Sequence, residues 1–476
     1  MTLSRTPFRA ESPLSVSAIL TVVALTLFAT PAPALAGSGI RDSEIEKTLR
    51  SYGEPIWKAA GLDPAAIHVY IINDSSINAF VAGGQNIFIN TGTIMELDTP
   101  SELKGIIAHE TGHIAGGHLA RGPEAMSKAE VPMLITMLAG VAAIAAGAPD
   151  VGMAMIVGAQ GVAQRELLAF SRQQESSADQ AGVKYLTSTG QSAKGMLEVF
   201  SKFADQEALT GDRQDPFVRS HPLSRDRIAA LEQMVAASPF RDKPDSKQEL
   251  EAYAMLRAKL RGFIDSPEVT LRHYPLTDTS IPARYARAVA YFKGADLETA
   301  LAQIDSLIKE RPTYPFFWEL RGQILVESSK PVEGVPAYRK AVELAPDEPL
   351  LQASLGAALV ATEDPKLMEE AKTHLKLAIE QEPDNAMAWY YLSNVYDTEG
   401  NQAMAALATA ERAFAVQDMA GAMQFAKRAQ KELKQGTQDW QRANDILAVA
   451  QAQMPNRRRQ QFELMPHVTF SGSTVH

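Results

Sequence analysis

Three prolines in the C-terminal half of the chain recur at nearly constant intervals. Pro312, Pro346 and Pro383 are separated by 34 and then by 37 residues, and residues 363–365 mark a small insertion. A 34-residue period is typical of a two-helix unit that cannot bury its apolar face alone. The period therefore predicts an α-solenoid, in which each unit packs against its neighbours.

The residues between these prolines follow the register of the tetratricopeptide repeat. Its positions are filled by Trp318, Gly322, Tyr338 and Ala341 in one unit, by Leu355, Gly356, Ala371 and Ala378 in the next, and by Trp389, Leu392 and Tyr396 at the start of a third. A generic helical bundle is the alternative, but it requires no fixed register. We expect residues 282–453 to form a repeat domain with a concave groove for peptides or partner proteins.

The segment His109-Glu110-Thr111-Gly112-His113 indicates a metal site in the N-terminal half of the chain. An apolar stripe predicts a helix over residues 101–119, so that the two imidazoles share one face. That spacing can place two nitrogens on one Zn²⁺, with Glu110 positioned as a base toward water. The motif also arises by chance, and a metal site therefore requires a third ligand from elsewhere in the chain.

Glu175 and Asp179 are the candidates for completing such a site, because they share one face of another predicted helix. One carboxylate could bind the metal, and the other could accept the free N–H of a ligand His and fix its tautomer. Two carboxylates on a solvated helix face are the alternative, which is commoner for an isolated pair. Beside the His motif, we favour the metal site.

The residue composition narrows the type of metal site. The chain contains no cysteine, which excludes thiolate ligands and disulfides. His118 falls one residue short of the third His of a metzincin, a position held here by Leu119. On a continuing helix His118 would point away from the site, and we expect it to be structural or to contact a ligand. A two-His, one-Glu set leaves a position for water, as in a catalytic zinc site.

The ordered motifs resemble those of the zinc metallopeptidases related to the CAAX-prenyl protease and HtpX. The similarity runs from about residue 42 to residue 234 and includes His109-Glu110-x-x-His113, Glu175-x-x-x-Asp179, Ser220-His221-Pro222 with Arg227, and Asn78-Ala79-Phe80. The narrower similarity is to periplasmic, BepA-like members that join this protease to tetratricopeptide repeats. It implies a mostly helical α+β chain, with a gluzincin-type metalloprotease domain that contains a small β-sheet.

The resemblance implies a role for each matching residue. His109, His113 and Glu175 would bind one Zn²⁺ per chain, Glu110 would be the general base, and Asp179 would orient a ligand His.

His221 and Arg227 would lie near the zinc. In BepA-like members the matching His is thought to occupy the open zinc position and keep the enzyme latent. In other members the equivalent region helps to stabilise the oxyanion, so either residue is a candidate for that role. A surface His before Pro222 is the alternative for His221.

Residues 1–36 are predicted to be a cleavable signal peptide. The segment has Arg5 and Arg9, an uncharged apolar run from Ile19 to Phe28, and the small-x-small sequence Ala34-Leu35-Ala36. We therefore expect a periplasmic protein, with a membrane anchor facing the periplasm as the alternative. The net charge of −10 argues against nucleic acid as a partner, because phosphate contacts need clustered Lys and Arg.

The remaining predictions concern the organisation of the chain. The metalloprotease domain is expected over residues 37–265. Within it we expect a helix at 44–60, strands at 68–72, 79–81 and 87–89, and an apolar helical hairpin at 131–164. A linker is expected at 266–281 and a disordered tail at 454–476. A sheet edge beside the zinc helix would let a peptide add as a strand. The hairpin arms are short for a membrane span, and we expect a lid or a peripheral membrane contact.

Together these features predict a zinc metalloendopeptidase that acts on exported proteins. The resemblance implies quality control or assembly of outer-membrane proteins, with the repeats binding clients or the assembly machinery. A chaperone-like adaptor with a latent or secondary protease site is the alternative. A purely structural zinc site is a third, weaker interpretation.

Overall fold

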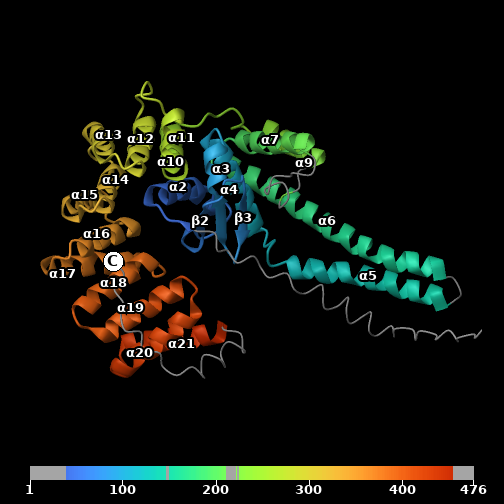
Figure 1. Cartoon of the computed structure of the whole chain (residues 1–476). Helices are drawn as coiled ribbons and strands as arrows, with labels where there is room; N and C mark the ends of the chain where they lie inside the picture. Colours follow the sequence, from blue (N-terminus) through green and yellow to red (C-terminus); the bar gives the residue numbers. More distant parts are fainter. Residues whose placement is uncertain (1–38, 146–148, 211–220, 222–223, 454–476) are drawn as a thin grey trace, which may run out of the picture. The chain divides into compact units, whose positions relative to one another are not determined.

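The structure is a computed structural model that describes residues 39–145, 149–210, 221 and 224–453. The predicted signal peptide and C-terminal tail lie outside the described residues. The described chain is mostly helical, with one small sheet in its N-terminal half and stacked helix pairs in its C-terminal half (Figure 1). This architecture confirms the predicted fold class.

The sheet has four short strands in the order β1-β2-β4-β3. They are β1 (Gly39–Ile40), β2 (His68–Ile72), β3 (Ala79–Ala82) and β4 (Asn86–Asn90). β2 pairs with β4 in parallel, with His68 opposite Asn86, whereas β3 pairs with β4 antiparallel, with Ala79 opposite Ile89. The last three strands coincide with the predicted ones, whereas β1, only two residues long, was not predicted. β3 lies at an edge of the described sheet.

The helix that carries the His-Glu-x-x-His motif lies at the centre of the protease domain. This helix is α4 (Pro100–Ala115); Thr99 caps its N-terminus, and Pro100 occupies its first turn. Its residues Leu103, Ile106 and Ile107 are fully buried in one core with the sheet. Other elements of this domain are α2 (Ser43–Ala59), η1 (Pro64–Ala66), α3 (Thr91–Glu96), α7 (Lys194–Thr210), α9 (Arg225–Ala237) and α10 (Lys247–Ile264).

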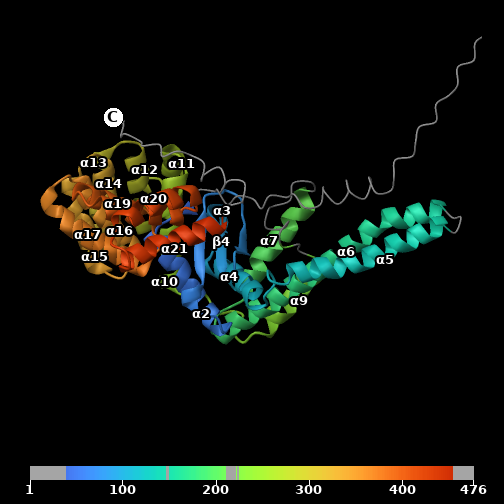
Figure 2. The ribbon, with the colours of Figure 1, turned by 90° about the horizontal axis from the view of Figure 1, so that it is seen from below.

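Two long helices, α5 (Gly122–Ala145) and α6 (Pro149–Ser188), lie side by side as an antiparallel hairpin (Figure 1 and Figure 2). α5 begins before the apolar hairpin predicted at residues 131–164, and α6 ends after it. Gly140 and Gly152 allow the close approach, because a Cβ on Gly140 would lie 2.7 Å from the Gly152 carbonyl oxygen.

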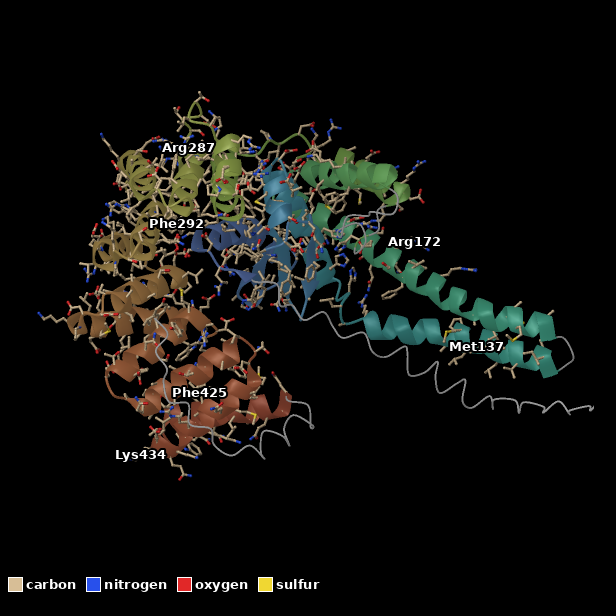
Figure 3. The ribbon with its side chains drawn as sticks, viewed as in Figure 1. Met137, Arg172, Arg287, Phe292, Phe425 and Lys434 are labelled. Atoms are coloured by element: carbon tan, nitrogen blue, oxygen red, sulfur yellow. The ribbon has the colours of Figure 1, made fainter. Side chains whose placement is uncertain are left out.

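Apolar side chains of this hairpin are exposed, and Figure 3 shows side chains along it, including Met137. The exposed large ones are Val131, Leu134, Ile135, Leu138, Val141, Ile144, Val151, Met153 and Leu168. Within the described part of the chain, no helix combines the length and apolar character needed to cross a membrane. Roles for the hairpin as a lid or as a peripheral membrane contact stay predictions.

The C-terminal half is a series of antiparallel helix pairs. They are α12 (Ile281–Lys293) with α13 (Leu297–Glu310), α14 (Pro315–Glu327) with α15 (Pro331–Leu344), α16 (Pro349–Ala361) with α17 (Met368–Gln381), α18 (Ala386–Thr398) with α19 (Gln402–Ala415), and α20 (Met419–Glu432) with α21 (Gln438–Gln453). A short helix, η2 (Pro365–Leu367), follows α16 where the insertion was predicted. The segment predicted as a linker contains α11 (Pro267–His273), because Ser266 caps it and Pro267 starts it.

Each repeating proline makes the same contact. The carbonyl oxygens of Pro312, Pro346 and Pro383 each accept a hydrogen bond from the side chain six residues later, at 2.9, 2.7 and 2.8 Å respectively. The repeated glycines have a packing reason as well: a Cβ on Gly322 would lie 2.7 Å from the Tyr338 ring. The predicted register therefore follows from how the helices of a pair approach.

A buried charge cluster joins the protease domain to the first repeats. The ammonium group of Lys259 on α10 lies 2.7 Å from Asp42, 3.3 Å from Glu44 and 3.3 Å from Glu319 on α14. Tyr285 of α12 donates a 2.7 Å hydrogen bond to Glu44. Removing one partner from such a buried set leaves an uncompensated charge, which is strongly destabilising. The start of α2 is therefore held against the repeats, while its other residues pack on α4.

Candidate metal centre

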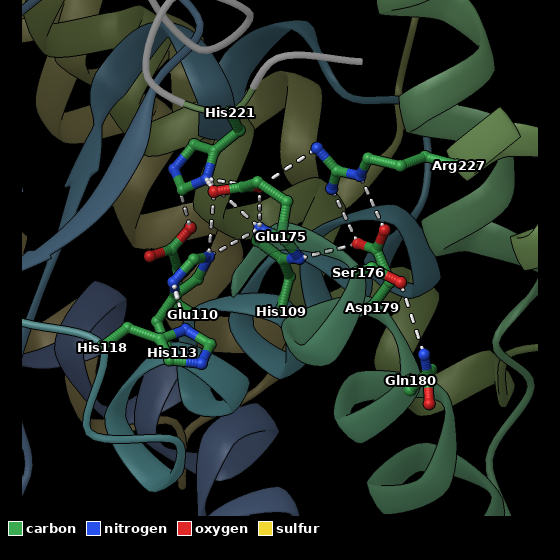
Figure 4. A network of polar contacts seen from close by, with 10 residues as sticks. All are labelled: His109, Glu110, His113, His118, Glu175, Ser176, Asp179, Gln180, His221 and Arg227. Carbon is green, nitrogen blue, oxygen red and sulfur yellow. Dashed lines mark hydrogen bonds and ion pairs between the residues drawn. The ribbon is translucent and has the colours of Figure 1, made fainter. Parts of the chain in front are cut away.

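Three segments that are distant in sequence meet at one buried cluster (Figure 4). α4 supplies His109, Glu110 and His113, and α6 supplies Glu175 and Asp179. The third segment supplies His221, which lies just before α9, and Arg227, which belongs to α9. His118, from the turn after α4, completes the group. The structure thus brings together every residue that was predicted for the site.

A glycine in the motif sets the distance between α4 and α6. A Cβ on Gly112 would lie 2.7 Å from the carbonyl oxygen and 2.8 Å from the Cα of Ala178. Real Cβ atoms do not approach backbone so closely, because interiors are packed to near van der Waals contact. The glycine therefore allows α6 to come close enough for its Glu175 and Asp179 side chains to reach the histidines of α4.

His109, His113, Glu175 and His221 each direct one potential ligand atom to a common point, with these atoms all within 4.8 Å of one another. His109 Nε2 lies 3.1 Å from His113 Nε2 and 3.2 Å from His221 Nδ1. Glu175 lies 3.3 Å from His109, 3.5 Å from His113 and 3.2 Å from His221. Three nitrogens and one carboxylate so arranged are a donor set that a metal ion can occupy.

A second layer of contacts holds this donor set in place. The Asp179 carboxylate lies 3.0 Å from His109 Nδ1, on the side of the ring opposite the cluster. Arg227 donates two hydrogen bonds of 2.8 Å to the Asp179 carboxylate, and its third guanidinium nitrogen lies 3.1 Å from the Glu175 carboxylate. In this conformation Arg227 holds two carboxylates, which favours a positioning role over contact with an oxyanion. The oxyanion role of Arg227 stays a prediction.

Glu110 is buried next to the cluster but does not belong to it. Its Oε1 lies 3.4 Å from His221 Nε2, so His221 faces the cluster with one nitrogen and Glu110 with the other. Burial raises the pKa of Glu110, against the lowering effect of the neighbouring histidines. A buried carboxylate with a raised pKa is suited to accept a proton near neutral pH.

The electrostatics of the cluster favour a positive charge. Burial by itself lowers the pKa of His109, but the contacts with Asp179 and Glu175 raise it to about 10. Burial would raise the pKa of Glu175, yet its contacts with His109 and His221 hold it well below its usual range. The pKa of His113 falls to about 2, chiefly through burial. The carboxylates thus stabilise a cation at the point where the ligand atoms converge.

His118 does not point away from the site, and the expectation to that effect was wrong. α4 ends at Ala115 rather than near residue 119, because Gly116 caps it and Gly117 adopts a φ of +62°. The chain turns there, and the His118 ring returns to His113, with 2.9 Å between their Nδ1 atoms. The pair Gly116-Gly117 was the available signal, since glycine after a helix commonly takes this left-handed conformation.

Phe200 is a site residue that sequence reasoning missed. Its ring lies edge-on to His109, with 5.2 Å between ring centroids, and the Arg227 guanidinium lies 5.9 Å from its centroid. It is almost fully buried on α7 and forms an apolar wall beside the cluster. An aromatic residue on a helix gives no sequence signal that separates such a wall from ordinary core.

The fold and the site define a metallopeptidase domain that is followed by a helical repeat domain. The sequence profile of peptidase family M48 matches residues 43–235, and that of the tetratricopeptide repeat matches residues 285–349. The chain contains a peptidase family M48 domain followed by tetratricopeptide repeats, and it is a metalloendopeptidase.

Several curated proteins are similar to this chain. The β-barrel assembly-enhancing protease of Yersinia pestis is 23% identical over 368 residues, which cover 76% of this chain and 74% of that protein. The protein of the same name from Escherichia coli strain K12 is 24% identical over 379 residues, covering 78% of this chain and 76% of that one. The metalloprotease LoiP of the same strain is 29% identical over 203 residues, covering 41% of this chain and 73% of LoiP.

Proposed function

We propose that this metalloendopeptidase uses one zinc ion, held by His109, His113 and Glu175, and by His221 in its latent state. The observation that carries the proposal is the spacing of the four ligand atoms. Ligand atoms around a tetrahedral zinc ion, at bonds of roughly 2.0–2.2 Å, lie about 3.3–3.6 Å apart. Five contacts between the ring nitrogens and carboxylate oxygens of these residues measure 3.1–3.5 Å, and the four ligand atoms all lie within 4.8 Å of one another. The donor set therefore fits zinc.

The residues of the chain divide the chemistry among them. Zinc, when bound, polarises the scissile carbonyl and makes water a better nucleophile. The Glu110 carboxylate takes the proton from the attacking water and passes it to the leaving amine. Asp179 accepts the N–H of His109 Nδ1, which leaves His109 Nε2 free to bind. Arg227 fixes Asp179 and Glu175 together.

His221 makes the resting site latent in this proposal. Its Nδ1 lies with the other ligand atoms, and its Nε2 faces Glu110, at 3.4 Å. A substrate carbonyl and a water molecule need that same space, so His221 has to leave before cleavage. Latency of this kind would protect the unfolded exported proteins that pass the enzyme.

The substrate is proposed to bind as an extended strand. β3 is an edge strand whose neighbour in the described sheet is β4, and it packs against α4. Its outer N–H and C=O groups are suited to pair with a peptide backbone. A peptide added there would run past α4, which carries two of the ligands and Glu110.

The repeats are proposed to bind client proteins or the assembly machinery. A cavity of about 250 Å³ lies among α17, α18, α19 and α21. Its lining includes Trp389, Leu392 and Tyr396, with Asp439 and Arg442 beside them. Aromatic and apolar walls with a few charged groups are typical of ligand pockets.

The biological setting is proposed from the relatives. Two of them are named β-barrel assembly-enhancing proteases. We propose that this chain acts in the periplasm, on outer-membrane β-barrel proteins that fail to assemble. The leader predicted for residues 1–36 supports export, and the alternative of a chaperone-like adaptor has no observation in its favour.

Cleavage of model peptides by the full-length chain tests the proposed activity. An extended peptide should be cleaved, and a helical peptide of the same composition should be cleaved more slowly. A metal chelator should remove the activity and added Zn²⁺ should restore it. Equal rates on both peptides would argue against strand addition, and activity that survives the chelator would contradict a metallopeptidase.

A further inference from the structure

His118 contacts a proposed zinc ligand from outside the ligand cluster. Its Nδ1 lies 2.9 Å from Nδ1 of His113, with the two rings edge-to-face and their centroids 4.9 Å apart. The opposite nitrogen of His113, Nε2, faces His109 at 3.1 Å. His118 itself is not one of the four residues whose ligand atoms converge. It therefore touches His113 on the side away from the metal position.

The tautomer of His113 follows from this arrangement. A neutral imidazole that binds a metal through Nε2 carries its hydrogen on Nδ1. That N–H points at His118 Nδ1, which must then be the acceptor. Ligand histidines commonly donate this second N–H to a carboxylate, carbonyl or water, which fixes the ring and makes it a better ligand. Asp179 does this for His109, and no carboxylate is found at the same distance from His113 Nδ1 among the described contacts.

The backbone around His118 is built to bring the ring to this place. The His118 amide donates to the His113 carbonyl at 3.1 Å, and the His118 carbonyl accepts from Gln174 at 3.3 Å. A Cβ on Gly116 would lie only 2.4 Å from His118 Nε2. Gly116 thus leaves room for the ring, in a helical backbone conformation that alanine also adopts.

We propose that His118 is a positioning residue: as an acceptor from His113 Nδ1–H, it fixes the tautomer and orientation of that ligand. This inference rests on the proposed zinc site. It assigns an imidazole acceptor to His113, in place of the carboxylate that serves His109. The consequence is a contribution to metal affinity that does not depend on substrate.

Metal affinity of the full-length chain tests this role. Zn²⁺ dissociation constants are measured by competition with a chelator for the wild type, His118→Leu, His118→Asn and Gly116→Ala, and Co²⁺ absorption reports the geometry of the site. We expect affinity to fall about 10–100-fold in His118→Leu, where no acceptor remains, and in Gly116→Ala, where the ring is displaced. His118→Asn keeps an acceptor oxygen near the position of Nδ1 and should stay within about threefold of the wild type.

Each result has a defined meaning. A folded His118→Leu chain that binds Zn²⁺ within about threefold of the wild type overturns the proposal, as does an equal loss in His118→Asn and His118→Leu, which would indicate packing alone. If His118→Leu fails to fold, Gly116→Ala decides, and an unchanged affinity in that variant overturns the proposal. A wild type that binds no Zn²⁺ would instead contradict the zinc site itself.

Discussion

Glu110→Gln should lower proteolysis by about 10²–10⁴-fold, the usual contribution of a general base, while Zn²⁺ content stays unchanged. Gln keeps the size of the side chain but cannot accept the proton of the attacking water. Glu110 is also not among the converging ligand atoms, so its loss leaves the metal in place. Cleavage rates and metal content, both measured on the purified full-length chain, check this expectation.

The same variant separates protease function from adaptor function. Glu110→Gln should still bind clients through the repeats and should trap them in cells, because cleavage no longer releases them. Glu198→Gln, on the exposed side of α7 and paired with Lys194, is the matched control and should behave as the wild type. Full proteolysis by Glu110→Gln would show that another group is the base.

His221→Ala should raise proteolysis, on the order of 10–100-fold, because it removes the fourth ligand from the latent site. If the closed form comprises roughly 90–99% of molecules, its removal increases the competent fraction by that factor. The structure supports this direction: His221 Nδ1 lies 3.2 Å from both His109 Nε2 and Glu175. Initial rates on an extended peptide, compared at equal Zn²⁺ occupancy, measure the effect.

A double variant controls for contaminating proteases. Glu110→Gln combined with His221→Ala should be as inactive as Glu110→Gln alone, since opening the site cannot replace the base. A loss of activity in His221→Ala would contradict the latent role. It would support the second role predicted for His221, stabilisation of the oxyanion.

The local parts of the site could be predicted because they depend on neighbours in sequence. The spacing of His109 and His113 places both rings on one helix face, and the Thr99-Pro100 start of α4 lies where its capping residues indicate. Glu175 and Asp179 form a similar pair on α6. Spacing therefore defines two of the four converging residues, His109 and His113, and narrows a third to Glu175 or Asp179; the family resemblance assigned that position to Glu175.

The remaining features depend on packing over long sequence distances. The hairpin was predicted too short, because α5 begins before its apolar run and α6 continues beyond its own. Arg227 was expected near the site, but its contacts with Asp179 and Glu175 could not be predicted, because they depend on how α9 packs. The buried group around Lys259 gave no signal, since its carboxylates come from α2 and α14. Periodicity does not report which distant side chains meet.

Zinc X-ray absorption of the purified full-length chain tests the central claim most directly, because it counts the imidazole ligands in solution. The latent site predicts three imidazoles and one carboxylate in the wild type, and two imidazoles with the carboxylate in His221→Ala. The same number of imidazoles in both proteins would contradict the claim that His221 closes the site.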